Sequence, residues 1–246
     1  MHAYSSFELR RILRDRRYLA VAVVWPVASY LLFSSVFGAA KDRAEGLGPH
    51  TEIMVAMATF GAIGSALVAT GPRLAAERRE GWLRQLAVTP LRPPTVLAAR
   101  VVTASVSTLP AVSLTFLAAA VVKGVGLAAW EWPTMAAVLL VGSLPFCLLG
   151  LLVGTVAEGD AATGLTMALY VSMGVLGGLW VPPPVLPAGM RAVALGLPSY
   201  RLAEVGWDLA AGTPPPVLAV AVIGAWLAGA ALLAAVLGRR MMTLTL

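Results

Sequence analysis

The stretch that decides the fold is Ile53-Met-Val-Ala-Met-Ala-Thr-Phe-Gly-Ala-Ile-Gly-Ser-Ala-Leu-Val-Ala-Thr-Gly71, which carries no charged side chain. Its length is close to the roughly 20 apolar residues that an α-helix needs to cross the hydrocarbon core of a bilayer. Buried helices of soluble proteins usually have shorter apolar runs, of about 10–14 residues. The stretch therefore predicts a transmembrane helix and places the chain among the α-helical membrane proteins.

Five further apolar stretches of similar length lie on either side of it. They cover residues 19–38, 101–122, 134–156, 161–181 and 217–237. The first is longer than the roughly 7–15 apolar residues of a signal peptide, so we expect it to be retained. Only 12% of the residues are charged, about half the share that is usual in a soluble domain. We predict an all-α integral membrane protein with about six transmembrane helices, forming a single domain over residues 1–246.

The positive charges alternate from loop to loop along the chain. Arginine is concentrated before the first predicted helix, in the loop after the second, and at the C-terminus. Because Lys and Arg collect in cytoplasmic segments, we expect both termini and this middle loop in the cytoplasm. The same scatter argues against nucleic-acid binding, which needs basic residues on one folded module. Together with a composition typical of a GC-rich bacterial genome, this pattern predicts a multi-pass protein of the bacterial inner membrane.

Residues 5–17 have the pattern of an amphipathic helix. Leu9 and Ile12 share one face at helical spacing, while Arg10 and Arg14 are among the arginines on the rest of the surface. Such a helix binds the anionic surface of membrane lipid, and it is equally suited to contact a cytosolic partner. Both interpretations stay open at this point.

The middle loop, residues 73–92, also has helical periodicity. Leu83 and Leu86 lie on one side and charged residues cover the other. Gly81 lies in its middle, where glycine costs a helix about 1 kcal/mol relative to alanine, so we expect a break or a close backbone contact there. Thr89-Pro90 is a signal for a helix to stop and restart. The loop is either a connector lying on the membrane or a helix that docks on a partner.

Residues 182–216 form the longest predicted outer loop. It opens with Pro182-Pro-Pro184 and closes with Pro214-Pro-Pro216, and both triplets break helices. The two apolar runs between them, residues 188–197 and 199–211, are too short to cross a bilayer. We expect a helical hairpin that dips into the outer leaflet and caps the transmembrane helices. Ser199 is the expected N-cap of its second helix and Gly212 the expected stop.

The groups that most enzymes and ion-coupled carriers use are scarce. His2 and His50 are the only histidines and Cys147 the only cysteine, so we expect no metal site and no catalytic residue in this chain. The predicted transmembrane helices hold almost no ionisable groups, although ion-coupled carriers usually need one near the membrane centre. Glu158 and Asp160 come closest, and we interpret them as a solvated turn. Any energy for transport should therefore come from outside the chain.

The middle loop resembles the cytoplasmic signature of ABC-2 type permeases, the membrane subunits of ATP-binding cassette exporters. The matching run is Glu77-Arg-Arg-Glu80-Gly81-Trp-Leu-Arg-Gln-Leu86-Ala-Val-Thr89-Pro90-Leu91: an acidic helix, a Glu-Gly pair, a Leu-rich turn, then Thr-Pro-Leu. The N-terminal helix is similar to the family's connecting helix, and residues 177–200 are similar to its outer hairpin. Pro93-Pro94 and Trp82 depart from the family pattern.

The resemblance implies a mechanism and a set of partners. Two permease subunits, identical or closely homologous, would pair around a central pathway, each resting on a separate cytosolic ATPase subunit that binds ATP and Mg. The middle loop would be the coupling helix that seats in this ATPase. The implied coupling residues are Glu77, Arg78, Glu80, Gly81, Arg84 and Leu86 in the loop, and Arg10 and Arg14 on the connecting helix.

The resemblance also implies that the second and fifth transmembrane helices line the pathway. Their candidate residues are Met54, Met57 and Phe60 on the second helix, and Met167, Tyr170 and Met173 on the fifth. Flexible methionines suit a tolerant apolar cavity, although ordinary packing explains the same pattern. The leading hypothesis is a permease that exports a hydrophobic drug or natural product. Export of a lipid-linked glycan is a variant, and a scaffold or sensor that recruits a cytosolic partner is the alternative.

Overall fold

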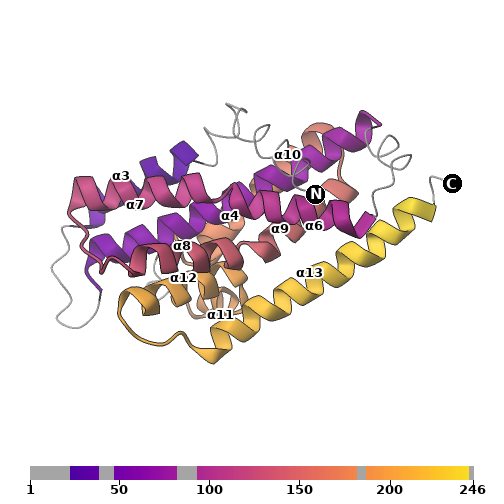
Figure 1. Cartoon of the computed structure of the whole chain (residues 1–246). Helices are drawn as coiled ribbons and strands as arrows, with labels where there is room; N and C mark the ends of the chain where they lie inside the picture. The colour runs from indigo at the N-terminus through magenta and orange to yellow at the C-terminus, as the bar shows by residue number, and fades with distance from the viewer. Residues whose placement is uncertain (1–22, 39–46, 82–92, 182–186, 244–246) are drawn as a thin grey trace.

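The computed structural model describes residues 23–38, 47–81, 93–181 and 187–243, without the side chains of 93–97 and 237–243. Every regular element in these ranges is a helix (Figure 1), which confirms the all-α class. The helices are α3 (Trp25–Phe37), α4 (Pro49–Arg79), α6 (Pro93–Val106), α7 (Leu109–Lys123), α8 (Glu131–Gly142), α9 (Leu144–Val156), α10 (Gly159–Leu176), α11 (Ala188–Gly196), α12 (Pro198–Ala210) and α13 (Val217–Thr243). The predicted connecting helix at 5–17 lies outside the described residues.

Four helical stretches are long and apolar enough to cross a membrane. They are Pro49–Arg79, Ala98–Lys123, Glu131–Val156 and Val217–Val236, and they correspond to the second, third, fourth and sixth predicted transmembrane helices. The described part of the first is the 13-residue α3, and the fifth corresponds to the 18-residue α10. The structure thus confirms a multi-helix membrane protein, and the count of six remains a prediction.

The third and fourth predicted helices are each broken near the middle, which their hydropathy did not indicate. The turn at Ser107–Thr108 separates α6 from α7, and Ser143 separates α8 from α9. Proline follows each break, as Pro110 and Pro145, and proline cannot donate to a carbonyl in the preceding turn. The Thr108 hydroxyl donates to the Ser105 carbonyl at 2.7 Å, and the Ser143 hydroxyl to the Leu140 carbonyl at 2.7 Å. The same two carbonyls also accept the backbone N–H of Thr108 at 2.9 Å and of Ser143 at 3.3 Å, so each hydroxyl adds a second hydrogen bond at its break.

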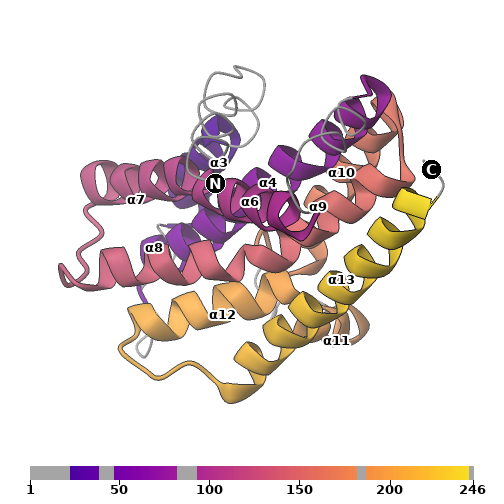
Figure 2. The same cartoon turned by 45° about the vertical axis from the view of Figure 1, so that its right-hand side comes forward.

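Helix α4 runs through the centre of the molecule, surrounded by α3, α7, α9, α10 and α12 (Figures 1 and 2). In its apolar part 89% of the residues are buried inside the chain, against 11% for α13. The closest neighbour is α9, which meets α4 through Gly150 and Gly154. A Cβ atom on Gly150 would lie 2.9 Å from the Leu67 carbonyl oxygen, and one on Gly154 would lie 2.6 Å from that of Gly71. Glycines four residues apart therefore let these two backbones touch.

Two short helices, α11 and α12, lie within one residue of the ranges expected for the outer hairpin, and their place at the outer leaflet stays a prediction. Helix α12 packs on α4, α8 and α13. Gly212 has φ +70° and stops it as predicted. The N-cap prediction for Ser199 was wrong, because α12 already begins at Pro198 and Ser199 is buried in its first turn. Proline has no N–H group, so the first turn needs one fewer cap.

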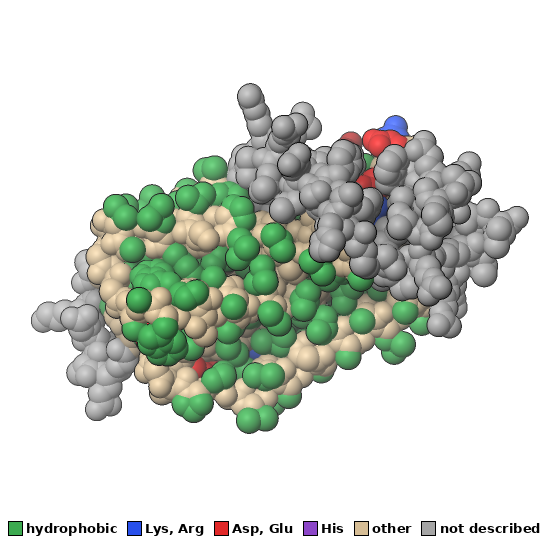
Figure 3. Space-filling model, viewed as in Figure 1, with side chains coloured by type: hydrophobic (Ala, Val, Ile, Leu, Met, Phe, Trp, Pro, Cys, Tyr) green, Lys and Arg blue, Asp and Glu red, His purple; other side chains and the backbone are tan. Residues whose placement is uncertain are grey.

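The surface agrees with a location in lipid. Figure 3 shows hydrophobic side chains spread over the visible face, while charged side chains gather mainly at one end of the molecule. Large apolar side chains such as Leu32, Leu117, Val121 and Leu232 are more than half exposed. Water does not wet a surface of this kind, whereas the acyl chains of a bilayer cover it at no cost.

Candidate functional site

The candidate site is the end of α4 that enters the predicted coupling loop. We expected the transmembrane helix to end near Gly71, but α4 continues through Pro72 to Arg79. Gly81 then has φ +74°, a left-handed conformation that ends helices and that glycine adopts without strain. The predicted break at Gly81 is confirmed. Residues 73–79 of the loop are therefore a rigid extension of the central helix.

Glu77 faces the interior from this extension, with 1% of its surface exposed. The Arg100 guanidinium on α6 forms an ion pair with its carboxylate, and the Nε of Arg73 lies 3.9 Å away, one helical turn earlier. A buried carboxylate needs such partners, because its desolvation is otherwise very costly. The ion pair between Glu77 and Arg100 joins the residues that enter the middle loop to those that leave it.

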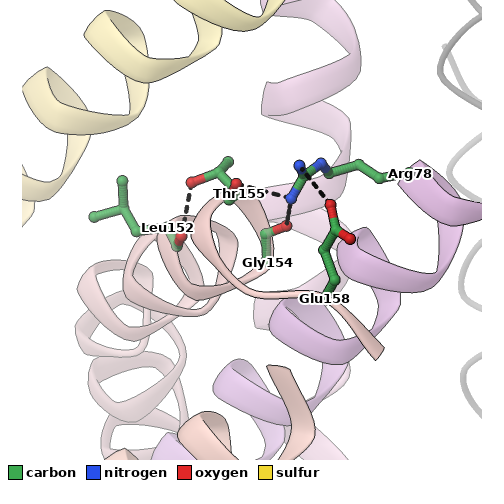
Figure 4. A network of polar contacts seen from close by, with 5 residues as sticks. All are labelled: Arg78, Leu152, Gly154, Thr155 and Glu158. Atoms are coloured by element: carbon green, nitrogen blue, oxygen red, sulfur yellow. Dashed lines mark hydrogen bonds and ion pairs between the residues drawn. The ribbon is translucent and has the colours of Figure 1, made fainter. Parts of the chain in front are cut away.

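Arg78 points the other way, toward the end of α9 (Figure 4). One of its terminal nitrogens, Nη1, donates to the carbonyl oxygens of Gly154 at 2.9 Å and Thr155 at 2.8 Å. The other, Nη2, lies 3.4 Å from the Glu158 carboxylate. The last carbonyls of a helix lack partners within it and carry partial negative charge, so a guanidinium is well placed there. Arg78 thereby caps α9 from a different helix.

The turn between α9 and α10 behaves as the sequence predicted. Glu158 and Asp160 are both exposed, and 77% of the Glu158 side chain is accessible. An ion pair that is so exposed contributes little to stability. The attachment of Arg78 to this turn therefore rests mainly on the two carbonyl bonds of the half-buried guanidinium.

The predicted coupling residues occupy different environments. Glu77 and Arg78 are bound within the chain, whereas Glu80 is exposed at the end of α4 and Gly81 is half-buried beside it. The remaining four lie outside the described residues: Arg84, Leu86, Arg10 and Arg14. Contact of these residues with an ATPase stays a prediction.

The candidate pathway residues of α4 and α10 meet in the membrane part of the molecule. The Tyr170 ring stacks on Phe60 with centroids 4.1 Å apart, and Trp180 meets Phe60 edge-on at 5.4 Å. Gly64 makes room for this stack, because a Cβ there would lie 2.4 Å from the Tyr170 ring. Met54, Met57 and Met173 are buried and Met167 is half-buried. Within one chain these side chains are packed together, so a pathway lined by them stays a prediction.

Comparison with known proteins decides the family. The sequence profile described as "ABC-2 type transporter" matches residues 2–205 of the 246. This chain belongs to the ABC-2 type transporter family. The permease is also similar to the protein named "Putative transport permease YvfS" of Bacillus subtilis (strain 168). The two are 29% identical over 211 residues, which cover 86% of this chain and 85% of that protein.

Family membership confirms the resemblance seen in the sequence. The permease is the membrane subunit of a transporter, and the family in general works with an ABC ATPase. Helix α13, from Val217, lies beyond the matched residues. It is tied to the rest of the permease by the Trp226 indole, which donates to the Gly196 carbonyl at 3.0 Å.

A groove of about 290 Å³ lies beside that bond, between α9 and α13. Its lining is apolar: Leu149, Ala225, Trp226, Gly229, Ala230 and Leu233. Hydrophobic walls of this kind offer no group for catalysis. Among the residues that the structure describes, no three His, Cys, Asp or Glu side chains come together as a metal site.

Sequence reasoning missed two features of this end of the permease. Arg100 was not singled out in the sequence, yet it is the partner of Glu77. The backbone carbonyls that Arg78 binds cannot be recognised in the sequence, because every residue carries such a group. The available signal was the position of Arg100 at the edge of an apolar run, where a half-buried charge needs an opposite charge nearby.

Proposed function

We propose that this chain is the membrane-spanning subunit of an ATP-driven ABC exporter that moves a hydrophobic or amphipathic compound, a drug or natural product, out of the cytoplasm or inner leaflet. The transport class follows from the family, and the apolar character of the candidate pathway supports the substrate class. The observation that carries the proposal is the unbroken α4, which holds the buried Met54 in the membrane part and Glu77 in the predicted coupling loop.

The energy comes from a separate ATPase subunit, which binds ATP and Mg, so this chain needs no cofactor of its own. Each permease subunit rests on one ATPase through the coupling loop and the connecting helix. Two permease subunits, identical or closely related, enclose the pathway in the bacterial inner membrane, with their N and C termini in the cytoplasm. ATP binding closes the ATPases, and the loops carry that movement into the transmembrane helices.

The side chains around Phe60 favour an apolar substrate over a glycan. Phe60, Tyr170 and Trp180 are aromatic, and the neighbouring Met54 and Met57 are flexible and apolar. Methionine adapts to ligands of differing shape because it is unbranched and polarisable. Glycans favour linings that are both aromatic and polar, and of these five residues only Tyr170 and Trp180 carry a hydrogen-bonding group. The variant of lipid-linked glycan export therefore ranks second within the class.

The first experiment identifies the partner. The tagged chain is purified from its native membrane in mild detergent, and proteins present in stoichiometric amount are identified by mass spectrometry. We expect an ATPase with a phosphate-binding Walker motif. A stoichiometric partner without that motif would favour the alternative function, a scaffold or sensor that recruits a cytosolic protein.

The second experiment tests coupling. Inside-out vesicles containing the permease and its ATPase are given ATP and a mixture of hydrophobic compounds, and the compounds retained are identified by mass spectrometry. We expect Glu80→Ala combined with Arg84→Ala to abolish ATP-dependent uptake while membrane insertion, measured by protease protection, stays normal. An ATPase variant that cannot hydrolyse ATP serves as the negative control. Uptake that survives the double change contradicts the coupling role.

A further inference from the structure

We infer that Arg78 is a positioning residue that carries movement of the middle loop to α9 and α10, so that the inner ends of α4, α9 and α10 move as one body. This inference rests on the proposed function, because the loop moves only if an ATPase drives it. It assigns Arg78 a role inside the permease, where the family resemblance implied a contact with the ATPase.

The first support is the kind of bond that Arg78 makes. Its two acceptors are backbone carbonyls, of Gly154 and Thr155, which lie 76 and 77 residues further along the chain. A backbone acceptor cannot turn away as a side chain can, so the guanidinium holds the end of α9 itself. Two hydrogen bonds donated by one planar group fix the orientation of the guanidinium relative to α9 as well as its distance from it.

The second support is the packing beside those bonds. Gly154, one of the acceptors, lies directly against the Gly71 backbone of α4. The inner ends of α4 and α9 are thus joined by a polar clamp and by backbone contact a few residues away. Gly159 begins α10 only four residues after Thr155, with φ +53° in the connecting turn. A movement of the end of α9 therefore reaches α10 through a short connection.

The third support is that α4 is anchored at the residue next to Arg78. The neighbouring Glu77 pairs with Arg100 of α6 and fixes the two ends of the middle loop relative to each other. A force on the loop then moves the end of α4 as a whole instead of bending it. The adjacent Arg78 passes this movement to α9, while Tyr170 and Phe60 hold α10 on α4 deeper in the membrane.

The test measures the distance between α4 and α10 by pulsed electron paramagnetic resonance. Spin labels are placed at Ala76→Cys on α4 and Ser172→Cys on α10, two exposed positions, in a Cys147→Ala background. Ser172 lies 13 residues after the start of α10, which is about 20 Å of helix and sets a measurable separation. The assembled permease and ATPase are compared without nucleotide and after trapping with ATP and vanadate.

With Arg78 present, we expect one narrow distance distribution that is the same in both states. With Arg78→Ala, we expect a broader distribution whose centre differs between the two states. Arg78→Lys should restore part of the effect, because the ammonium still donates to a carbonyl. Arg79→Ala is the matched control, since it removes the same charge from the next, exposed position, and it should leave the distribution unchanged.

Either of two results overturns the inference: a distribution for Arg78→Ala that matches the parent in both states, or a parent distance that changes on trapping. Each variant is first checked by size-exclusion chromatography, so that misfolded protein is not measured. The nucleotide-free comparison is repeated on the permease alone. If no ATPase associates, the proposed function fails, while the broadening caused by Arg78→Ala still tests the clamp.

Discussion

Gly150 is one of the two glycines through which α9 meets the backbone of α4, and its missing side chain is what permits the contact there. We expect Gly150→Ala to destabilise the protein by about 1–3 kcal/mol, the usual effect of forcing a methyl group into a packed core. The new Cβ would overlap the Thr70 hydroxyl and lie 2.9 Å from the Leu67 carbonyl. The measurement is the melting temperature in detergent, followed by fluorescence-detected size-exclusion chromatography.

Gly224→Ala provides the control for this prediction. Gly224 lies on α13, and a Cβ atom added there would have no heavy atom of the described residues within 4 Å beyond its own stretch of helix. This change should leave the melting temperature unchanged or raise it slightly, since alanine favours helices. Equal losses at both positions would mean that the loss of glycine itself, and not the contact with α4, lowers stability.

Single residues were predictable where their effect is local. Gly81 and Gly212 were predicted to stop helices, and both have positive φ, because the backbone conformation at a helix end depends on few neighbours. The burial of Glu77 was not predictable, since it depends on Arg100, which is distant in the sequence. The Ser199 cap failed for a related reason: two strong signals, proline and serine, were adjacent, and the proline set the helix start.

At the scale of elements, the stability of the predicted outer hairpin depends on pH. Burial, together with the nearby charge of Glu204, raises the pKa of Asp208 above its usual value near 3.8. The folded state therefore binds a proton more tightly than the unfolded state does. The contribution of Asp208 to the free energy of unfolding is fully present below about pH 3.8. It is lost as pH rises through the raised pKa.

We accordingly expect the contribution of Asp208 to the melting temperature to fall as pH is raised from about 4 towards neutral. Asp208→Asn should remove this component and flatten the difference between the two pH values. The comparison is made in the same detergent at constant ionic strength. A variant with the same pH dependence as the parent would show that Asp208 does not contribute.

The elements themselves were largely predictable, because proline triplets and long apolar runs mark their boundaries. The interruptions at Ser107–Thr108 and Ser143 were not. Average hydropathy over a run does not register a local break, and the hydroxyls that stabilise the break are compatible with an unbroken helix as well. The extension of α4 past Pro72 was also missed. Helix propensity alone predicts an end there, but packing against α9 and α10 keeps the helix intact.

At the scale of the whole molecule, the proposed orientation makes a direct prediction. A membrane-impermeant maleimide should label Ala129→Cys in intact spheroplasts, and should label Ala76→Cys only after the membrane is opened. Both positions are exposed and lie at opposite ends of the bundle. The parent, with Cys147 fully buried, should remain unlabelled and serves as the background. Labelling of Ala76→Cys in intact spheroplasts would invert the orientation.

The burial of α4 also bears on how the protein is made. This central helix leaves the ribosome before α7, α9, α10 and α12, four of the helices that enclose it. The acceptors of Arg78 are synthesised 76 residues later, which takes roughly 4–15 s at the usual rates of translation. During that interval α4, a glycine-rich helix with a charged end, lies in the bilayer without these neighbours. A membrane insertase or chaperone that shields α4 in this period should therefore control the yield of assembled protein.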